Sequence, residues 1–351
     1  MTNWRPAAGN PVAGRRAMEV IMREHLIRGT GPLLDEYGRL REPGYATKPP
    51  FDYSHDRIAA QRWRIKDWDY YLVQDDAYAI ALTFSDLGYI GLVSAAVMDF
   101  ASRSSITASE LVLLPMGRMG LPESSETGDI AWENKRCRVC FAHTSAGRRL
   151  SFTLRDFSDG DDFEAEVLLD REPRDSMVIV TPWSRNDKAF YYNRKIVGMR
   201  ARGGFRCGAL VHEFDGDDAF GLLDWGRGVW TYDNTWYWSA AMGVQQGHVV
   251  GFNLGYGFGD TSAASENMVF VDGVAHKLGR LTFDIPIGSD GKPRYLDPWN
   301  IDEASGRLRL VFRPLLDRSD LIDVAHVLVS DQHQLFGTFT GTVTLDDGSV
   351  L

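Results

Sequence analysis

The feature that most constrains the fold is a long series of short segments in which apolar and polar residues alternate. Alternation with a period of two places successive side chains on opposite faces of a β-strand. Asp, Gly or Ser residues separate the segments, at the short spacing of an antiparallel meander. The segments are residues 70–73, 78–84, 89–98, 111–114, 139–141, 150–154, 163–169 and 177–180, and then 205–214, 220–224, 235–242, 248–254, 268–271, 281–285, 308–312 and 335–343. The chain is therefore predicted to be mainly β.

The strand pattern stops around residues 181–186 and then restarts. Closing an antiparallel sheet into a barrel removes its exposed edges, and a barrel of about eight strands is just wide enough to hold one small ligand. We therefore predict two tandem antiparallel β-barrels or sandwiches. The first would cover residues 31–183, and the second, residues 184–351, would hold the ligand cavity.

Residues 13–28 follow a different pattern, because their mostly apolar positions recur at helical spacing. These positions are Ala17, Met18, Ile21, Met22, His25 and Leu26. The spacing predicts a short amphipathic helix within an N-terminal extension, residues 1–30. This helix would dock on a sheet or join two copies of the chain into a homo-oligomer. A second short helix is predicted near residues 320–328.

The charge of the chain limits its partners. Lys and Arg number 38 against 48 Asp and Glu, a net charge of -10, which argues against nucleic acid and against an anionic membrane surface. No apolar run approaches the roughly 20 residues of a membrane-spanning helix, and the N-terminus lacks the apolar core of a secretory signal. We therefore predict a cytoplasmic protein without stable membrane insertion, whose partner is a small hydrophobic molecule.

Residues 224–260 concentrate aromatic side chains and glycines. Four of the ten tryptophans lie here, namely Trp225, Trp230, Trp236 and Trp238. Trp236 and Trp238 share one face of a predicted strand, and aromatic rings can stabilise a carbocation or bind a flat apolar ligand. Packing of a barrel interior explains the same residues without any ligand. Both interpretations stay open at this point.

Asp224 is the candidate catalytic acid or base. It ends an apolar strand segment, and a carboxyl group in apolar surroundings is suited to transferring a proton. His248 and Tyr232 are its predicted catalytic partners. The structural alternative is that Asp224 pairs with Arg227 or caps a turn through the neighbouring glycines.

Further residues of the second predicted barrel would line its cavity. The predicted ligand-binding set is Trp225, Arg227, Trp230, Trp236, Trp238, Asn253, Tyr256, Glu266, Asn267 and His276. The polar members lack the close spacing of metal-ligand motifs, and the three cysteines do not form two matching pairs, so no metal is predicted. The glycines around Tyr256 lack the spacing and the following helix of a dinucleotide site, so no cofactor is predicted.

Five stretches carry a family resemblance: Gly31–Leu40 with Glu42–Gly44, Asp224–Trp230, Thr235–Trp238, Gly251–Asn267 and Gly337–Gly341. They resemble a bacterial family known as domain of unknown function 2804. Tyr191–Lys195 followed by Gly198, together with Asp224 and Trp225, is more distantly similar to the superfamily of carotenoid 1,2-hydratase (hydroxyneurosporene synthase) and AttH. The distant resemblance implies two tandem lipocalin-like barrels.

These features together predict a cofactor-independent hydratase, lyase or isomerase. It would act by acid–base chemistry on a hydrophobic small molecule held in a tryptophan-lined barrel cavity. The first alternative is a non-catalytic, lipocalin-like carrier of a lipophilic ligand. The second is a structural interaction protein that assembles through its N-terminal helix.

Overall fold

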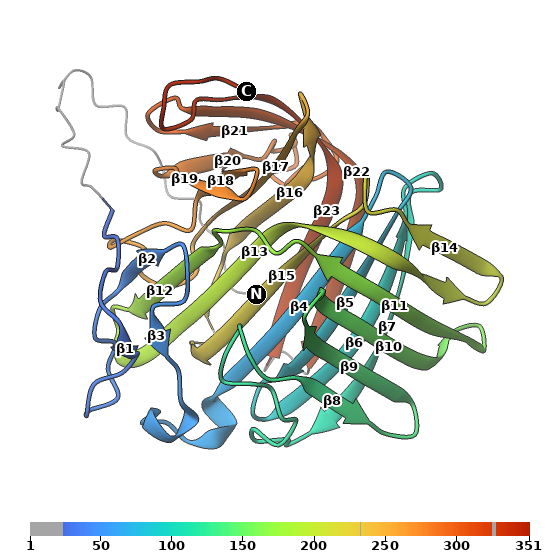
Figure 1. Cartoon of the computed structure of the whole chain (residues 1–351), viewed down its shortest axis with the longest axis horizontal. Coiled ribbons are helices and arrows are strands. Elements are labelled where there is room, and N and C mark those ends of the chain that lie inside the picture. The colour runs from blue at the N-terminus through green and yellow to red at the C-terminus, as the bar shows by residue number, and fades with distance from the viewer. Residues whose placement is uncertain (1–23, 232, 325–327) are drawn as a thin grey trace.

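A computed structural model of the chain describes residues 24–231, 233–324 and 328–351 (Figure 1). Nearly all its regular structure is β-strand, so the prediction of a mainly β chain is confirmed. The only helical elements in the described residues are two short 3₁₀-helices, η1 (His55–Arg57) and η2 (Arg62–Arg64). No helix in this part of the chain has both the length and the apolar character to cross a membrane.

The largest element is a curled sheet of 13 strands that forms a half-barrel. Its strand order is β7-β6-β5-β4-β15-β13-β11-β10-β9-β8, while β12 and β14 also pair with β13, and β2 pairs with β12. Every pairing in it is antiparallel. The strands are β2 (Gly44–Ala46), β4 (Lys66–Gln74), β5 (Tyr78–Asp86), β6 (Ile90–Asp99), β7 (Ser104–Leu113), β8 (Ile130–Glu133), β9 (Cys137–Thr144), β10 (Gly147–Ser158), β11 (Asp161–Asp170), β12 (Met177–Trp183), β13 (Asn186–Cys207), β14 (Leu210–Phe214) and β15 (Phe220–Val229).

Two further sheets of four strands each form what we call the C-terminal layer (Figure 1). The first is β16 (Tyr237–Gln245), β17 (His248–Tyr256), β18 (Met268–Val271) and β19 (Val274–Lys277), and the second is β20 (Leu281–Asp284), β21 (Trp299–Glu303), β22 (Leu308–Val324) and β23 (Leu328–Val343). A small parallel pair, β1 (Gly31–Pro32) and β3 (Phe51–Asp52), completes the strands of the described residues.

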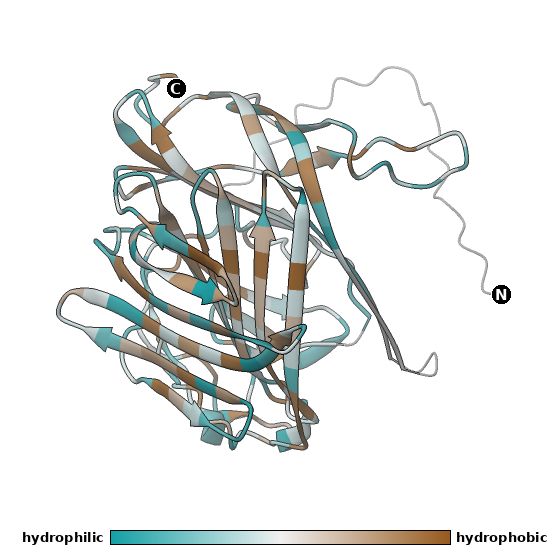
Figure 2. Ribbon diagram, turned by 90° about the vertical axis from the view of Figure 1, so that its right-hand side faces the viewer, coloured by the Kyte–Doolittle hydropathy of each residue, from teal (hydrophilic) through white to brown (hydrophobic). Residues whose placement is uncertain are grey.

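Hydrophobic residues occur along the strands of the large sheet (Figure 2), and in its central strands β4 and β15 the residues of both faces are buried. The inner face carries the main apolar core, with Tyr71 and Val73 of β4 among its members. The outer face packs against the C-terminal layer, where Tyr70 of β4 meets the Trp238 ring edge-on. Gln334 Nε2 of β23 also donates a hydrogen bond to the Tyr70 hydroxyl at 2.7 Å. Because both faces are covered, polar residues on either face of β4 and β15 lie in buried surroundings.

The predicted tandem arrangement of two barrels is not confirmed. Strands from both sides of the expected boundary at residues 183–184 hydrogen-bond in the large sheet, since β15 pairs with both β4 and β13. The predicted break falls at the tight connection from β12 to β13. A turn is present at these residues, but it connects two paired strands of one sheet and does not separate two domains.

Both predicted helices fail where the structure describes them. The part of the N-terminal helix within the described residues, 24–28, is extended, and Leu26 forms a bridge with Tyr45. Residues 1–23 lie outside the described residues. In the second predicted helix, residues 320–324 lie in β22 and residue 328 begins β23, while residues 325–327 lie outside the described residues. In both places cross-strand hydrogen bonding outweighs a local apolar periodicity that also fits a helix.

Candidate active site in the half-barrel

Strands β4 and β15 bring three charged residues onto the inner face of the half-barrel. Asp67 and Asp69 are two positions apart on β4, so both point inward, as Arg227 does from β15. Arg227 is fully buried, with 0% of its side chain exposed. Charged groups are rarely buried so completely unless they are paired. We call Tyr53, His55, Asp67, Asp69 and Arg227 the half-barrel site.

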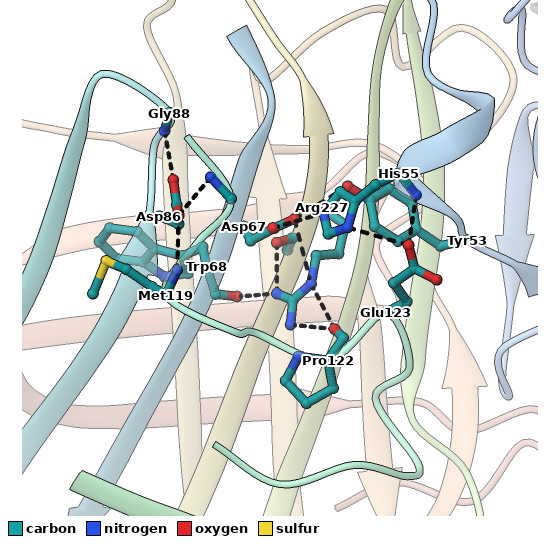
Figure 3. Close-up of polar contacts among 12 residues, drawn as sticks. Tyr53, His55, Asp67, Trp68, Asp86, Gly88, Met119, Pro122, Glu123 and Arg227 are labelled. Carbon is teal, nitrogen blue, oxygen red and sulfur yellow. Dashed lines mark hydrogen bonds and ion pairs between the residues drawn. The ribbon is translucent and has the colours of Figure 1, made fainter. Parts of the chain in front are cut away.

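Arg227 is satisfied by two carboxylates and by backbone carbonyl groups (Figure 3). Its Nη1 donates to Asp69 Oδ1 at 2.7 Å and to the Trp68 carbonyl at 3.0 Å. Its Nε lies 3.6 Å from Asp67 Oδ1. Its Nε and Nη2 both donate to the carbonyl oxygen of Pro122, at 3.1 and 2.9 Å. The guanidinium group therefore holds two strands and a loop together.

His55 forms a hydrogen-bonded pair with Asp67 at the edge of this group. His55 Nε2 donates to Asp67 Oδ2 at 2.8 Å, and the Tyr53 hydroxyl donates to Asp67 Oδ1 at 3.1 Å. On its other side, His55 Nδ1 lies 3.1 Å from Glu123 Oε1. The histidine side chain is 29% exposed and that of Glu123 is 45% exposed. The imidazole thus links a buried carboxylate to the surface.

The protonation of these groups is shifted by their surroundings. Burial alone would lower the pKa of His55, but the hydrogen bond and charge of Asp67, with the charge of Glu123, raise it overall. Burial and the nearby Asp67 charge raise the pKa of Tyr53 well above its ordinary value, so its hydroxyl stays protonated. Burial also raises the pKa of Asp69. Shifted pKa values that gather beside a cavity are typical of catalytic sites.

Residues 116–129, which we call the covering loop, lie across this site. The Asp86 carboxylate anchors one end, accepting hydrogen bonds from the backbone N–H groups of Gly117 at 2.8 Å and Met119 at 3.3 Å. Arg227 holds the Pro122 carbonyl in the middle. Arg148 of β10 holds the far end through the Ser125 carbonyl at 2.7 Å. Charged side chains of the sheet therefore fasten the loop at three points.

A small cavity of about 10 Å³ lies beneath the covering loop. The sheet contributes apolar and aromatic walls together with a few polar groups. The lining residues are Asp69, Tyr71, Pro122, Ser124, Ser125, Gly128, Ile130, Phe141, His143, Arg148 and Trp225. Burial raises the pKa of the lining Tyr71 to about 12. Among the described residues, no three His, Cys, Asp or Glu side chains are grouped so that they could hold a metal ion.

A second polar group lies between the large sheet and the C-terminal layer, and we call it the interlayer cluster. Its members are Asn193, Lys195, Asp224, Trp238, Asn253 and Glu266. Lys195 Nζ lies 2.8 Å from Asp224 Oδ1 and 3.8 Å from Glu266 Oε2. It also lies 5.0 Å from the centre of the Trp238 ring, the usual range of a cation–π contact. The cluster joins β13 and β15 to the layer that covers them.

The amide side chains complete the interlayer cluster. Asn253 Nδ2 donates to Glu266 Oε2 at 3.0 Å, and Trp238 Nε1 donates to Asn253 Oδ1 at 2.6 Å. Asn193 Nδ2 donates to Asp224 Oδ1 at 2.7 Å. Asp224, Trp238, Asn253 and Glu266 were all predicted as site residues. The structure brings these four together.

Comparison with protein families decides the family membership of the chain. The model of the family described as "Domain of unknown function (DUF2804)" matches residues 24–351. The chain belongs to this family. This confirms the resemblance that the sequence motifs predicted. A search of curated proteins returned no match for this DUF2804 member.

Solved structures that resemble the DUF2804 chain are distant from it in sequence and in fold. An AttH candidate from Nitrosomonas europaea is 11% identical, covering 82% of this chain and 91% of its own, with a TM-score of 0.44. Kievitone hydratase from Nectria haematococca is 9% identical, covering 78% and 87%, with a TM-score of 0.45. CghA with Sch210972 is 9% identical, covering 79% and 84%, with a TM-score of 0.39. At these TM-scores the likeness supports no conclusion about activity.

The DUF2804 structure separates Asp224 from Arg227, which the sequence placed together. The two residues are three positions apart on β15, an odd offset that sends them to opposite faces. Asp224 pairs with Lys195 in the interlayer cluster, while Arg227 pairs with Asp69 inside the half-barrel. The expected pairing of Asp224 with Arg227 is therefore wrong. Trp225 accompanies Arg227 on the inner face.

The other predicted polar residues take separate positions. His248 pairs with Asp272 at 2.7 Å, and His276 pairs with Asp346 at 3.2 Å. Buried Asn267 bonds to backbone groups only, accepting from the Gly255 N–H and donating to the Gly279 carbonyl. Tyr232 lies outside the described residues.

The remaining predicted aromatic residues form two packed groups. Trp230 and Trp236 both contact Phe258 edge-on, with ring centres 5.7 and 5.8 Å away. Tyr256 packs with Tyr237 and Phe283. These contacts account for the aromatic side chains by packing, which was the open alternative in the sequence.

Sequence reasoning missed four members of the half-barrel site, namely Tyr53, His55, Asp67 and Asp69. One signal was available. Asp67 and Asp69 stand on the same face of a strand whose next inward positions are Tyr71 and Val73. Two acids in register with buried positions are unusual and indicate a buried cation. That cation, Arg227, lies far along the chain, so the sequence alone did not connect them.

Proposed function

We propose that the half-barrel site carries out acid–base chemistry on a hydrophobic small molecule, as a hydratase, lyase or isomerase does. The observation that carries this proposal is the His55–Asp67 pair, in which a half-exposed imidazole is held by a buried carboxylate at 2.8 Å. A buried carboxylate fixes the orientation of the ring and stabilises its protonated form. His55 is the proposed catalytic residue and Asp67 is a positioning residue.

The chemistry follows from the two sides of the imidazole ring. Nε2 is occupied by Asp67, so Nδ1, which now faces Glu123, is the nitrogen available to a ligand. In a hydration, His55 would give its proton to one carbon of a double bond, and water would bond to the other carbon. The water then loses a proton to the neutral imidazole, which restores His55. The reverse sequence removes water, and loss of a different carbon-bound proton gives an isomer.

The electrostatics of the site support proton donation by His55. Its raised pKa keeps a larger share of the ring protonated near neutral pH than in a free histidine. The Tyr53 ring lies 5.2 Å from the His55 ring, centre to centre, and the Trp225 ring lies 6.4 Å from that of Tyr53. Aromatic faces can stabilise positive charge on a nearby ligand carbon. The site therefore combines a proton donor with a surface that tolerates a cationic intermediate.

The direct test is turnover in deuterated water. A panel of apolar alkenes and unsaturated ketones is incubated with the full chain, and mass spectrometry detects added water or exchanged deuterium. His55→Asn is expected to lower turnover by about 10²–10⁴-fold, the usual contribution of a positioned proton donor. The matched control is His212→Asn, because His212 forms another histidine–aspartate pair with Asp75 at 2.6 Å. The control should retain turnover.

The assignment of Asp224 and His248 as catalytic residues is a rival to this proposal. Asp224→Asn and His248→Asn are therefore measured in the same assay. Loss of turnover in Asp224→Asn with full turnover in His55→Asn would move the reaction to the interlayer cluster and overturn the proposal for His55. Binding without conversion of any compound would favour the carrier function instead.

A further inference from the structure

Trp225 carries a hydrogen-bond donor that no described residue satisfies. The side chain is only 2% exposed, and its indole Nε1 has no hydrogen-bond partner. Buried indole N–H groups usually have a hydrogen-bond acceptor. A buried donor without one has lost its hydrogen bond to water and has no other hydrogen bond in its place, which costs free energy. An unpaired donor on the wall of a cavity indicates that something else supplies the acceptor.

The Trp225 ring cannot turn to find another partner. The guanidinium carbon of Arg227 lies 4.4 Å from the ring centre, which places a cation against the indole. Tyr192 and Tyr53 meet the ring edge-on, with ring centres 5.4 and 6.4 Å away. Tyr192 is itself fixed, because its hydroxyl donates to the Phe51 carbonyl at 3.2 Å. The direction of the N–H group is therefore set by packing.

The cavity beside Trp225 has the composition of a small-molecule site. Phe141, Ile130 and Trp225 provide apolar walls, while Tyr71 and Arg148 are polar. Ligand sites are typically apolar with a few fixed polar groups. The present volume of about 10 Å³ is what a single water molecule needs. A larger ligand therefore requires movement of a wall.

The covering loop is the part of the cavity wall that does not belong to the sheet, so it is the part whose displacement would make room for a ligand. Pro122, Ser124, Ser125 and Gly128 belong to it and line the cavity, whereas the other lining residues lie on strands of the large sheet. Gly117, at the start of the loop, has a φ of +82° and free space around its Cβ position. Displacing this loop enlarges the cavity at the expense of the hydrogen bonds from Arg227 to Pro122 and from Arg148 to Ser125, while the strand pairing of the large sheet stays intact.

We propose that this cavity binds a mostly apolar small molecule through one neutral acceptor oxygen, a carbonyl in particular, which accepts a hydrogen bond from Trp225 Nε1. This inference deepens the proposed function and rests on it only for the claim that the bound molecule reacts at His55. A donor without acceptor capacity selects an acceptor oxygen. A site built to hydrogen-bond an oxygen rejects an analogue that lacks it.

The charges at the cavity favour a neutral oxygen over a carboxylate. The Asp69 carboxyl group is on the wall and disfavours an anion. Arg148 would attract one, but its three nitrogens are engaged. They contact Glu172 at 3.1 Å, His143 at 2.8 Å and the Ser125 carbonyl at 2.7 Å. A ketone or similar group accepts from Trp225 Nε1 and needs no counter-ion, so it leaves the contacts of Arg148 with Glu172 and His143 in place.

The test uses two probes of nearly equal shape, methyl naphthyl ketone and ethylnaphthalene, which differ in the carbonyl oxygen. Calorimetric titration of the full chain should show the ketone binding about three- to tenfold more tightly, the effect of one hydrogen bond. In Trp225→Phe this preference should disappear. Trp132→Phe, which changes a tryptophan of the same sheet outside the cavity lining, should keep it.

A spectroscopic readout in the unmodified chain covers the case in which Trp225→Phe does not fold. A hydrogen bond from Trp225 should lower the carbonyl stretching frequency of the bound ketone relative to the ketone in an apolar solvent. Equal affinities for the two probes, no binding of either, or a preference that survives in Trp225→Phe would overturn the proposal. His55→Asn should keep the preference, so loss of turnover without loss of binding separates this inference from the proposed function.

Discussion

The half-barrel site and the interlayer cluster are built on the same strand and differ in what surrounds them. Arg227 and Asp224 stand three residues apart on β15, one inside the sheet and the other outside it. Each belongs to a buried group in which a cation meets two carboxylates, Asp67 with Asp69 or Asp224 with Glu266. Composition alone does not distinguish the two groups.

Access distinguishes them. The half-barrel site reaches the surface through His55, whose side chain is partly exposed, and a single loop covers the rest of it. The interlayer cluster lies between a sheet and a folded layer, and Asn253 and Trp238 of that layer are part of its hydrogen bonding. Opening it means separating the layers. We infer that the first group is suited to chemistry because it includes a partly exposed imidazole, whereas the second joins the sheet to the layer that covers it.

The largest predicted effect is the loss of the buried cation in the half-barrel. Arg227→Met removes the buried cation between Asp67 and Asp69, so Asp67 keeps only Tyr53 and His55 as partners, and it frees the Pro122 carbonyl. Removing one member of a buried ion pair costs about 3–5 kcal/mol of the free energy of unfolding. The measurement is the urea midpoint of unfolding. Arg206→Met is the control, because Arg206 pairs with Glu164 on the surface, and its midpoint should hardly change.

A smaller effect is expected at the interlayer cluster. Lys195→Met leaves Asp224 and Glu266 without their cation, but these side chains are 14% and 16% exposed, so water reaches them. We expect a loss of about 1–3 kcal/mol. Denaturation of the double variant Lys195→Met with Asp224→Asn is the decisive comparison. It should recover part of the loss, and a loss as large as that of Arg227→Met would show that the two groups are equally enclosed.

The class of fold could be predicted from local pattern, and the arrangement of the strands could not. Alternation along residues 70–73 and 220–224 identifies strands, because burial of one face imposes it. Pairing of β15 with β4 joins residues about 150 positions apart, such as Leu222 with Leu72. The residues that neighbour Leu72 or Leu222 in the sequence do not indicate that these two strands pair. Two sets of strands therefore suggested two barrels where the chain builds one large sheet.

The same limit explains the site prediction. Asp224, Trp238, Asn253 and Glu266 lie in one cluster, but it is located between two layers and not in a barrel cavity, so their role in ligand binding or catalysis stays a prediction. Lys195, the cation of this cluster, is not among the predicted site residues, although the motif Tyr191–Lys195 carries the more distant family resemblance. His55 is not among the predicted site residues, because it lies in a turn-rich segment whose apolar residues show neither strand nor helix periodicity. A residue whose role comes from a partner on another strand has no local signature.

The smallest predicted effect is the dependence of stability on pH. It distinguishes the two groups, because the half-barrel site contains a histidine, His55, and the interlayer cluster as defined contains none. The raised pKa of His55 means that the folded chain binds this proton more tightly than the unfolded chain. The resulting stabilisation is fully present below the ordinary value of 6.5. It is lost as pH rises through the raised folded-state value.

We therefore expect the Tm, followed by circular dichroism, to fall slightly across that window in the unmodified chain. His55→Asn should remove the slope, and Glu123→Gln should reduce it, because one of the two carboxylates that stabilise the imidazolium is gone while Asp67 remains. Lys195→Met lowers the Tm at every pH but should leave the slope unchanged. An NMR titration of the His55 ring checks the cause directly. An undisturbed slope in His55→Asn would assign the pH dependence to another group and remove the main electrostatic argument for His55 as a proton donor.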